Sequence, residues 1–362
     1  MKNRKIMHVG AIATSVLGVV LAATVVDGQQ GQRQVNDWLA QMDADKDGKI
    51  SRAESLGLMK RNFDRVDQDE NGLLTQSELT ALAGRLSRSR FQPRKGAQGR
   101  PAIPSDAEIL QRVPKGVRVE LDVAYRDGDE AWKLDLAMPS GDARSPRPAI
   151  VFVHGGGWTK GDKRTAAFIG QALDYAAKGY VTVTVNYRLD GTKLPCIEDV
   201  KCSVRWLRAH AKKYHVDPDR IGAYGNSAGA HLVTMLGISH TEERLEGDGP
   251  WKEYSSRVQA VVASATPTSP RVRGEVEFNE SLIQPMSYIT ADAPPFLLFH
   301  EVSDNTVSVS NSDEFAKAMR AAGAKDLTYH RYTDGTGHGV FQRNIKKTAP
   351  LMEAFFARTL AQ

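Results

Sequence analysis

A serine set among small residues is the clearest candidate for covalent chemistry in this sequence. Ser227 lies at the centre of residues 225–229, which read Gly-Asn-Ser-Ala-Gly, between a short apolar run and a predicted amphipathic helix over residues 228–236. Small neighbours allow a tight turn between a strand and a helix that pushes the serine hydroxyl outward. The helix also directs backbone N–H groups and its positive dipole end toward that hydroxyl. The run alone is a weak signal, but it predicts a nucleophile beside an oxyanion site.

Two acidic segments form the second chemical feature. Residues 43–54 and 67–78 each place oxygen-bearing residues at alternate positions around a central glycine, and each ends in a glutamate. A twelve-residue loop of this pattern supplies the six or seven oxygens that Ca²⁺ prefers. The predicted ligands are Asp43, Asp45, Asp47, Lys49 through its carbonyl, Ser51 and Glu54, and then Asp67, Asp69, Asn71, Leu73 through its carbonyl, Thr75 and Glu78. The alternative is a pair of acidic turns that bind no metal.

The tandem loops resemble the EF-hand family over residues 34–82. Ile50 and Leu74 occupy matching positions, so we expect a short backbone bridge between the loops. The loops are closely spaced, which makes a free-standing sensor that opens toward targets a poor fit. Calcium is abundant outside the cytoplasm, so the resemblance implies a structural or adhesive role for the Ca²⁺ sites.

The residues after about position 113 predict the elements that must position Ser227. Residues 117–125 and 131–138 read as a hairpin across an Asp-Gly turn. Strands at 149–153, 181–187, 221–224, 258–264, 295–299 and 327–332 alternate with helices at 164–178, 197–214, 311–322 and 349–360. Such alternation predicts an α/β fold with one mostly parallel sheet flanked by helices, after a small all-α N-terminal pair.

The ordered motifs of this half resemble the α/β-hydrolase superfamily. They are residues 154–158 (His-Gly-Gly-Gly-Trp), 186–189 (Asn-Tyr-Arg-Leu) and 225–229. They are most similar to the hormone-sensitive-lipase-like and feruloyl-esterase-like esterases, and the resemblance covers residues 113–362. In that family the order of catalytic residues is serine, acid, histidine.

The resemblance implies a triad of Ser227, Asp304 and His338. Asp304 follows the predicted strand 295–299, and His338 lies in a glycine-rich loop after the next strand. Ser227 would attack the acyl carbon, His338 would transfer the proton, and Asp304 would fix the imidazole tautomer. Glu301 competes with Asp304, because the usual His-Gly-Asp-x-Asp pattern of the family is altered here.

The resemblance also assigns an oxyanion hole to the backbone N–H groups of Gly156, Gly157 and Ala228. The other histidines near these motifs are weaker candidates for the base. His154 is expected to organise its loop and His231 to face the core or a neighbouring loop, whereas two more lie on or at the edge of strands: His300 and His330.

The first 28 residues predict an export signal. Lys2, Arg4 and Lys5 precede an apolar run over residues 6–26. The alternative is an uncleaved segment that anchors the chain in a membrane. Residues 83–112 carry several arginines among Ser, Gly, Pro and Gln, and we expect a flexible basic linker there.

The composition suits a soluble globular protein, with 41% hydrophobic and 25% charged residues among 362. The net charge of +5 is modest, and no basic stripe is interleaved with aromatic residues, so we expect no nucleic-acid partner. Cys196 and Cys202 fall in one predicted helix and are expected to be buried thiols.

Together these features predict an exported serine esterase. The loops at 240–256 and 267–290 are polar, which suits a small-molecule or carbohydrate ester with a short acetyl or feruloyl group. Two alternatives stay open. One is a serine peptidase of the same fold, and the other is a calcium-dependent attachment protein with an inactive hydrolase domain. The N-terminal region would then contact a cell surface or polysaccharide.

Overall fold

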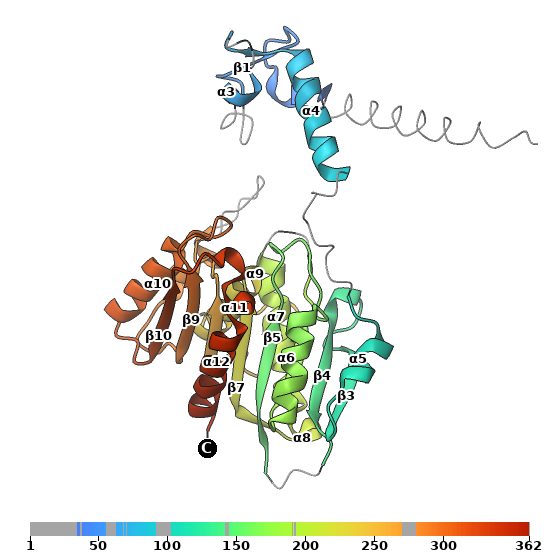
Figure 1. Ribbon diagram of the computed structural model, residues 1–362, viewed down its shortest axis with the longest axis vertical. Helices are drawn as coiled ribbons and strands as arrows, with labels where there is room; N and C mark the ends of the chain where they lie inside the picture. The colour runs from blue at the N-terminus through green and yellow to red at the C-terminus, as the bar shows by residue number, and fades with distance from the viewer. Residues whose placement is uncertain are drawn as a thin grey trace, which may run out of the picture. The chain divides into compact units, whose positions relative to one another are not determined.

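The computed structural model describes most of the chain after position 34 (Figure 1). The described residues are 35–36, 38–55, 63–67, 69, 71–91, 103–141, 145–189, 191, 193–269 and 280–361. The chain divides into two compact units, residues 1–100 and 101–362. The predicted export signal, residues 1–28, lies outside the described residues. Within the described part, no helix is both long enough and apolar enough to cross a membrane.

The N-terminal unit is built around two loops that meet at a two-stranded sheet. β1 (Ile50–Ser51) pairs with β2 (Leu73–Leu74) in antiparallel fashion, and Ile50 lies opposite Leu74 as the sequence predicts. Residues 35–36 and 38–42 are helical, α3 spans Phe63–Val66, and α4 spans Gln76–Phe91. A small core holds them together, comprising Val35, Met42, Ile50, Phe63, Val66, Leu74, Leu79 and Ala83.

The prediction of a flexible linker over residues 83–112 is wrong at both ends of that range, where the structure has helices. α4 continues to Phe91, because the arginines and leucine there are good helix formers. α5 (Asp106–Arg112) begins at Ser105, whose hydroxyl accepts from the Glu108 N–H while the Glu108 side chain accepts from the Ser105 N–H. This capping box satisfies helix-end donors, and the missed helix follows from it. Residues 92–102 are outside the described part.

An 8-stranded sheet forms the centre of the second unit, in the order β10-β9-β8-β7-β5-β6-β4-β3. β3 and β4 form the predicted antiparallel hairpin, β4 is also antiparallel to β6, and the other neighbours run parallel. The strands are β3 (Val117–Ala124), β4 (Lys133–Pro139), β5 (Arg147–Val153), β6 (Val181–Val185), β7 (Val216–Asn226), β8 (Ala260–Ser264), β9 (Phe296–Glu301) and β10 (Leu327–Tyr332).

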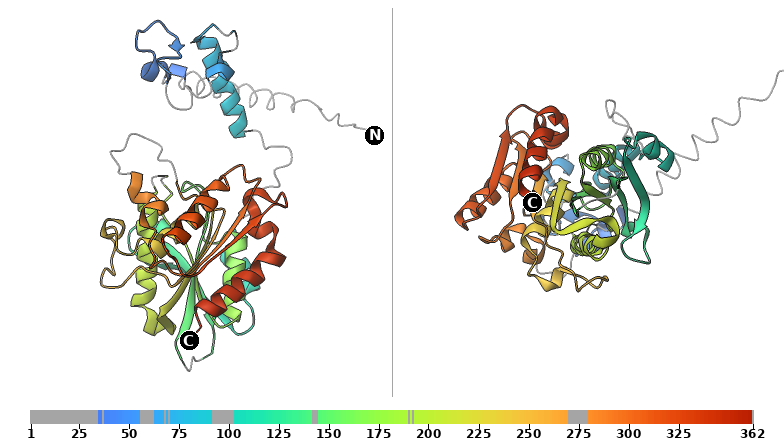
Figure 2. Two further views of the ribbon diagram at one scale, coloured as in Figure 1. Left: turned by 90° about the vertical axis from the view of Figure 1, so that its left-hand side faces the viewer. Right: turned by 90° about the horizontal axis from the view of Figure 1, so that it is seen from below.

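Helices cover both faces of this sheet (Figure 2). One face packs against α6 (Ala166–Ala177), α11 (Val340–Arg343) and α12 (Ile345–Thr359). The other packs against α7 (Leu194–Ala209), α9 (Ala228–Ile238) and α10 (Ser310–Ala321), while α8 (Ala211–Tyr214) follows α7. Short 3₁₀ helices are η1 (Glu130–Trp132), η2 (Glu243–Leu245), η3 (Glu280–Ile283), η4 (Pro285–Tyr288) and η5 (Gly337–Gly339).

Burial on both faces explains the continuous apolar run of β5. Ile150 and Phe152 lie in one core, and Val151 and Val153 lie in the other. The predicted α/β class with a mostly parallel sheet is therefore confirmed. Both cysteines are buried thiols on α7, as expected.

Candidate functional site

Ser227 occupies a sharp turn between β7 and α9. Its backbone angles, φ 56° and ψ −122°, are strained for a residue with a side chain. The turn is fixed by close packing, since a Cβ on Gly225 would overlap the Gly229 carbonyl and one on Gly229 would overlap the Val153 carbonyl. The Ser227 N–H donates to the Ser264 carbonyl on neighbouring β8 at 2.9 Å. Gly225 and Gly229 are therefore required because any side chain there would overlap neighbouring backbone atoms.

His338 connects Ser227 to Asp304. Its Nε2 lies 2.9 Å from the Ser227 hydroxyl oxygen, and its Nδ1 lies 2.8 Å from Asp304 Oδ2. Asp304 follows β9, and His338 lies in η5 after β10, so loops at the carboxyl ends of parallel strands bring the three together. A carboxylate only accepts, so Nδ1–H donates to Asp304 and Nε2 is left to accept the serine proton. This is the geometry that a serine nucleophile requires.

Asp304 is held as an ionised acceptor. Its Oδ1 accepts from the N–H groups of Thr306 at 2.8 Å and Val307 at 3.0 Å, and His300 Nε2 lies 3.3 Å from its Oδ2. Burial alone raises the pKa of Asp304, but hydrogen bonds from His300, His338 and these two amides outweigh it and hold the pKa well below its usual range. Asp304, rather than its competitor Glu301, carries the hydrogen bond to the His338 ring.

The glycine loop after β5 lies against the serine turn. A Cβ on Gly155 would be 2.7 Å from the Asn226 carbonyl oxygen and 3.2 Å from Ser227 Cβ. Gly156 and Gly157 follow with φ of +133° and +64°, a region that favours glycine. Ala228 is the first residue of α9, directly after Ser227. The structure thus brings together the segments that carry all three predicted oxyanion donors.

His231 bridges three segments around this loop, a role that the sequence does not reveal. The Trp158 indole N–H donates to His231 Nδ1 at 3.3 Å, and His231 Nε2 lies 2.8 Å from the Ile283 carbonyl. A carbonyl accepts, so Nε2 carries the proton. Burial lowers the pKa of His231 to about 4, which keeps the ring neutral. Lys193 lies over the Trp158 ring, 5.0 Å from its centroid, so Trp158 is fixed on two sides.

The three other weaker candidates for the base, His154, His300 and His330, have structural partners. His154 Nδ1 lies 2.8 Å from the Gly155 carbonyl and its ring stacks on Tyr187, in agreement with a loop-organising role. Burial lowers the pKa of His154 to about 4. His300 Nδ1 lies 2.7 Å from the Ser312 hydroxyl. His330 stacks on a phenylalanine ring of β9.

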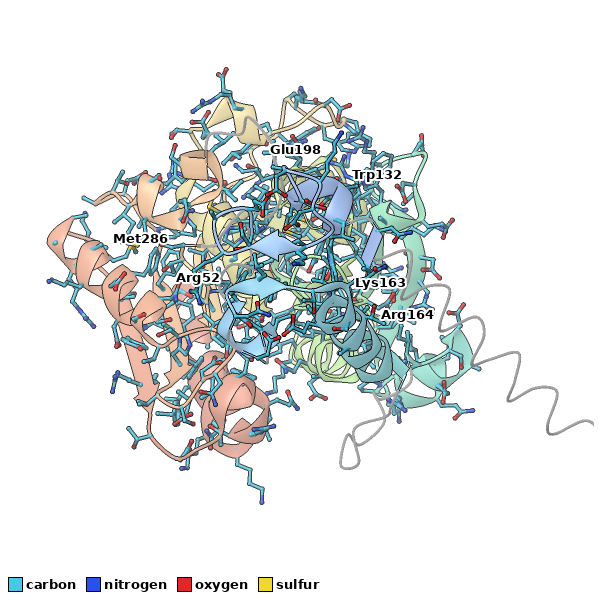
Figure 3. All side chains as sticks on the ribbon, turned by 90° about the horizontal axis from the view of Figure 1, so that it is seen from above. Arg52, Trp132, Lys163, Arg164, Glu198 and Met286 are labelled. Atoms are coloured by element: carbon cyan, nitrogen blue, oxygen red, sulfur yellow. The ribbon has the colours of Figure 1, made fainter. Side chains whose placement is uncertain are left out.

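A partly buried ion cluster supports the segment that follows the glycine loop. Lys163 and Arg164 lie side by side there (Figure 3) and bind the same two carboxylates, Asp122 and Asp135. The Asp135 side chain is fully buried, and the Lys163 N–H donates to the Asn186 side chain at 2.6 Å. Buried charges need complete pairing, so the loss of one partner would loosen this segment. Asn186 belongs to the second family motif, which is thereby given a structural role.

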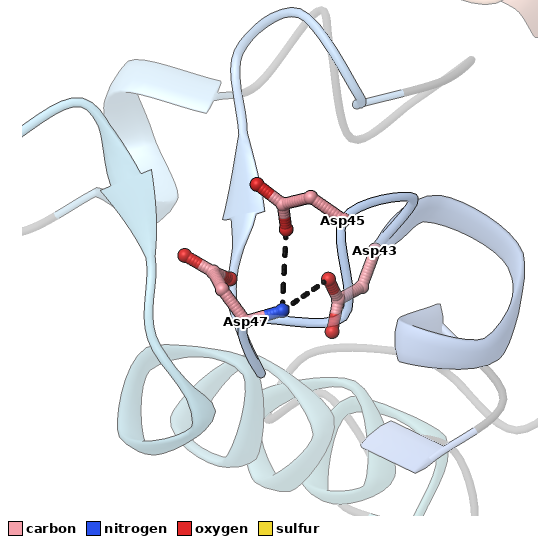
Figure 4. Close-up of side chains that lie close together, drawn as sticks. All are labelled: Asp43, Asp45 and Asp47. Carbon is pink, nitrogen blue, oxygen red and sulfur yellow. Dashed lines mark hydrogen bonds between the residues drawn. The ribbon is translucent and has the colours of Figure 1, made fainter.

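The first acidic loop has the shape of a cation site (Figure 4). Carboxylate oxygens of Asp43, Asp45 and Asp47 lie within 4.8 Å of one another. The Asp47 N–H donates to Asp43 at 3.1 Å and to Asp45 at 3.2 Å, and Gly48 makes the turn with φ 82°. Glu54 accepts from the Ser51 hydroxyl at 2.6 Å. These oxygen donors fit Ca²⁺ chemically.

The second loop repeats the arrangement. Asp67, Asp69 and Glu78 offer carboxylate oxygens within 4.8 Å of one another. The Gly72 N–H donates to Asp67 at 2.8 Å, and Thr75 donates to Glu78 at 2.7 Å. Of the predicted backbone ligands, Lys49 directly precedes β1, and Leu73 is the first residue of β2. Both loops therefore present the predicted donor types.

Comparisons with known proteins agree with this geometry. Residues 134–281 match the BD-FAE family model, and residues 35–54 match the EF-hand model. The chain is 27% identical to a probable carboxylic ester hydrolase, LipM of Mycobacterium tuberculosis, over 86% of this chain and 78% of LipM.

Solved structures share the fold of the second unit. Esterase 2 of Thermogutta terrifontis, solved after phosphorylation by paraoxon, is 29% identical with a TM-score of 0.59, covering 67% of this chain and 94% of that one. A bifunctional GH43-CE protein of Bacteroides eggerthii is 29% identical with a TM-score of 0.60, over 67% of this chain and 38% of that one. The chain is a carboxylic ester hydrolase of the α/β-hydrolase fold, with a match to the BD-FAE family model over residues 134–281 and an EF-hand motif near its N-terminus.

Proposed function

We propose that this esterase is exported and hydrolyses short-acyl esters, such as acetyl or feruloyl groups on carbohydrate, through Ser227, His338 and Asp304. The observation that carries the triad is the continuous hydrogen-bond chain, 2.9 Å from Ser227 to His338 and 2.8 Å from His338 to Asp304. Because Asp304 accepts a hydrogen bond from Nδ1–H, the Nε2 lone pair of His338 faces the serine hydroxyl.

The reaction follows from these positions. As Ser227 Oγ bonds to the acyl carbon, its proton moves to His338 Nε2, and the carbonyl oxygen becomes an oxyanion. Backbone N–H groups of Gly156, Gly157 and Ala228 are proposed to stabilise that oxyanion, and each such donor typically contributes about 3 kcal/mol. The imidazolium then protonates the leaving alcohol. Water repeats the sequence on the acyl-enzyme and regenerates Ser227.

The substrate class is supported by one polar segment and by a relative. The segment that begins at residue 267 follows the carboxyl end of β8, the end of the sheet where Ser227 lies, and its polar sequence suits a water-soluble alcohol better than a lipid interface. Residues 240–256 follow the far end of α9 instead, where His240 lies 3.7 Å from Asp292, so their polarity does not bear on the substrate. The Bacteroides eggerthii protein combines GH43 and CE parts, which supports a carbohydrate ester.

A panel of substrates tests this assignment. We expect the wild-type enzyme to hydrolyse p-nitrophenyl acetate and acetylated or feruloylated oligosaccharides, and to act weakly on long-chain esters and peptide amides. Ser227→Ala serves as the blank. Faster turnover of peptide amides than of esters would favour a peptidase. Calcium-dependent polysaccharide binding with no ester turnover would favour an attachment protein.

Export is proposed from the first 28 residues, where basic residues precede an apolar run. Cell fractionation with N-terminal sequencing tests it, and recovery of the intact chain in the cytoplasm would contradict it. Membrane retention of the intact chain would instead support an uncleaved anchor.

The two acidic loops are proposed to bind Ca²⁺ in a structural or attachment role. The sequence predicts twelve ligand positions, and six of their carboxylates support them by forming two groups of three whose oxygens lie within 4.8 Å of one another. Without a cation, these carboxylates repel one another.

Chelation by EGTA should therefore lower the thermal stability of the N-terminal unit and leave ester turnover within about twofold of its starting value. Calorimetry of the full chain, followed by addition of Ca²⁺, measures the first effect. The variant Asp43→Asn/Asp67→Asn is a matched control, because it should lose the response to Ca²⁺. Turnover that collapses on chelation and returns with Ca²⁺ would show instead that the loops are coupled to catalysis.

A further inference from the structure

Glu301, the last residue of β9, contacts the loop that carries His338. Its Oε2 accepts from the Gly337 N–H at 2.9 Å, and its Oε1 lies 3.3 Å from the Gly335 nitrogen. The Ser303 N–H at 2.9 Å and the Ser303 hydroxyl also donate to Oε2. One carboxylate therefore binds two backbone donors of the histidine loop and two donors of its own turn.

Within the described part of the chain, the Glu301 carboxylate interacts with these hydrogen-bond donors and not with a cationic side chain. The side chain is buried, and no ion pair to it is found among the residues that the structure describes. A carboxylate that accepts from backbone N–H groups forms stronger hydrogen bonds than a neutral acceptor does. The Ser303 hydroxyl, followed by the amides of Gly337, Ser303 and Gly335, outweighs the effect of burial and lowers the pKa of Glu301.

The histidine loop needs such a support. Gly335 and Gly337 both have positive φ, 75° and 57°, and glycine loses more backbone freedom on ordering than other residues do. Arg343 holds the other side of the loop by donating to the Thr336 carbonyl at 2.7 Å. Glu301 is thus the acceptor for the N–H groups, while Arg343 is the donor for the carbonyl.

We propose that Glu301 is a positioning residue that fixes residues 335–337 so that the His338 ring reaches both Ser227 and Asp304. The end of β9 and the turn after it then have two roles, because Glu301 holds the backbone that carries His338 while Asp304 orients the imidazole. Glu301 stands where the family pattern has glycine, so this device is a departure of this chain from that pattern. The inference rests on the proposed role of His338 as the base.

Two variants test the proposal with a readout that a merely structural role would not move. Glu301→Ala should lower kcat on p-nitrophenyl acetate by up to about 100-fold with KM within twofold, because a small displacement of a catalytic group has this effect. Glu301→Gln keeps the shape and one acceptor oxygen, so its loss should be smaller. Glu246→Gln is the matched control, since Glu246 binds Lys201, Arg205 and Ser256 away from the histidine loop. It should lower Tm and preserve kcat at low temperature.

Hydrogen exchange provides a measurement that does not depend on activity. In the wild-type enzyme the amides of Gly335 and Gly337 should be protected, and in the Glu301 variants they should exchange faster while α9 keeps its protection. Unprotected wild-type amides would overturn the proposal, even if no Glu301 variant folds. So would a folded Glu301→Ala enzyme with wild-type kcat, or a loss of kcat that disappears on cooling.

A different experiment would contradict the proposed triad. If wild-type turnover survives in Ser227→Ala, the catalytic assignment is lost, whereas the exchange data on residues 335–337 still report whether Glu301 fixes the loop.

Discussion

Replacement of His338 by alanine should reduce kcat on a short-acyl ester by about 10⁴- to 10⁶-fold. His338 Nε2 is the acceptor 2.9 Å from the Ser227 hydroxyl, and without it the hydroxyl must lose its proton to water. Both acylation and deacylation need this group, so neither step should become fast again. The remaining rate over water would come from the oxyanion donors and from binding.

His330→Ala is the matched control, because His330 lies on β10 upstream of the same loop and stacks on Phe299. Steady-state kinetics on p-nitrophenyl acetate should show this variant within about threefold of the wild type. A His338→Ala enzyme with more than about a tenth of wild-type kcat would mean that another base serves Ser227.

Asp304→Asn should lower kcat by about 10⁴-fold while the protein stays folded. The Asp304 Oδ1 atom accepts from two backbone amides, so in the variant the amide oxygen is expected to remain there. The new amide N–H₂ would then face His338 Nδ1, which favours the tautomer with hydrogen on Nε2. That tautomer cannot accept the serine proton.

The control for this variant is Asp313→Asn, an acid on α10 that accepts from Tyr329 and Arg331 and lies outside the triad. Its kcat should stay within about threefold of the wild type. Because the pKa of Asp304 is held well below its usual range, the wild-type carboxylate stays ionised throughout the neutral pH range. If kcat falls only a few-fold in Asp304→Asn, another acid must orient the His338 ring. In that case Glu301→Gln should lower kcat more than Asp304→Asn does.

Most of the second unit could be predicted because its elements follow simple periodicities. The continuous apolar run of β5 indicates burial on both faces, and the Asp-Gly turn indicates the β3–β4 hairpin. The turn at Ser227 could be predicted from the sequence because local backbone contacts require glycine at positions 225 and 229.

The remaining features depend on partners that are distant in the chain. Ser105 and Glu108 form the capping box of α5 in a stretch whose composition suggests a linker. The composition therefore favoured a linker although the capping-box residues indicate a helix. His231 meets Trp158 and Ile283 only after folding, and no periodicity reveals those contacts. Glu301 was recognised only as a competitor of Asp304, because its backbone partners carry no side-chain signal in the sequence.

The most direct test of the serine mechanism is mass spectrometry of the enzyme after reaction with an organophosphate ester, with peptide mapping. The account predicts one phosphoryl adduct, on Ser227, that is absent in Ser227→Ala and forms at least about 100-fold more slowly in His338→Ala. An adduct on a different residue, or equal labelling rates with and without the His338 ring, would contradict it.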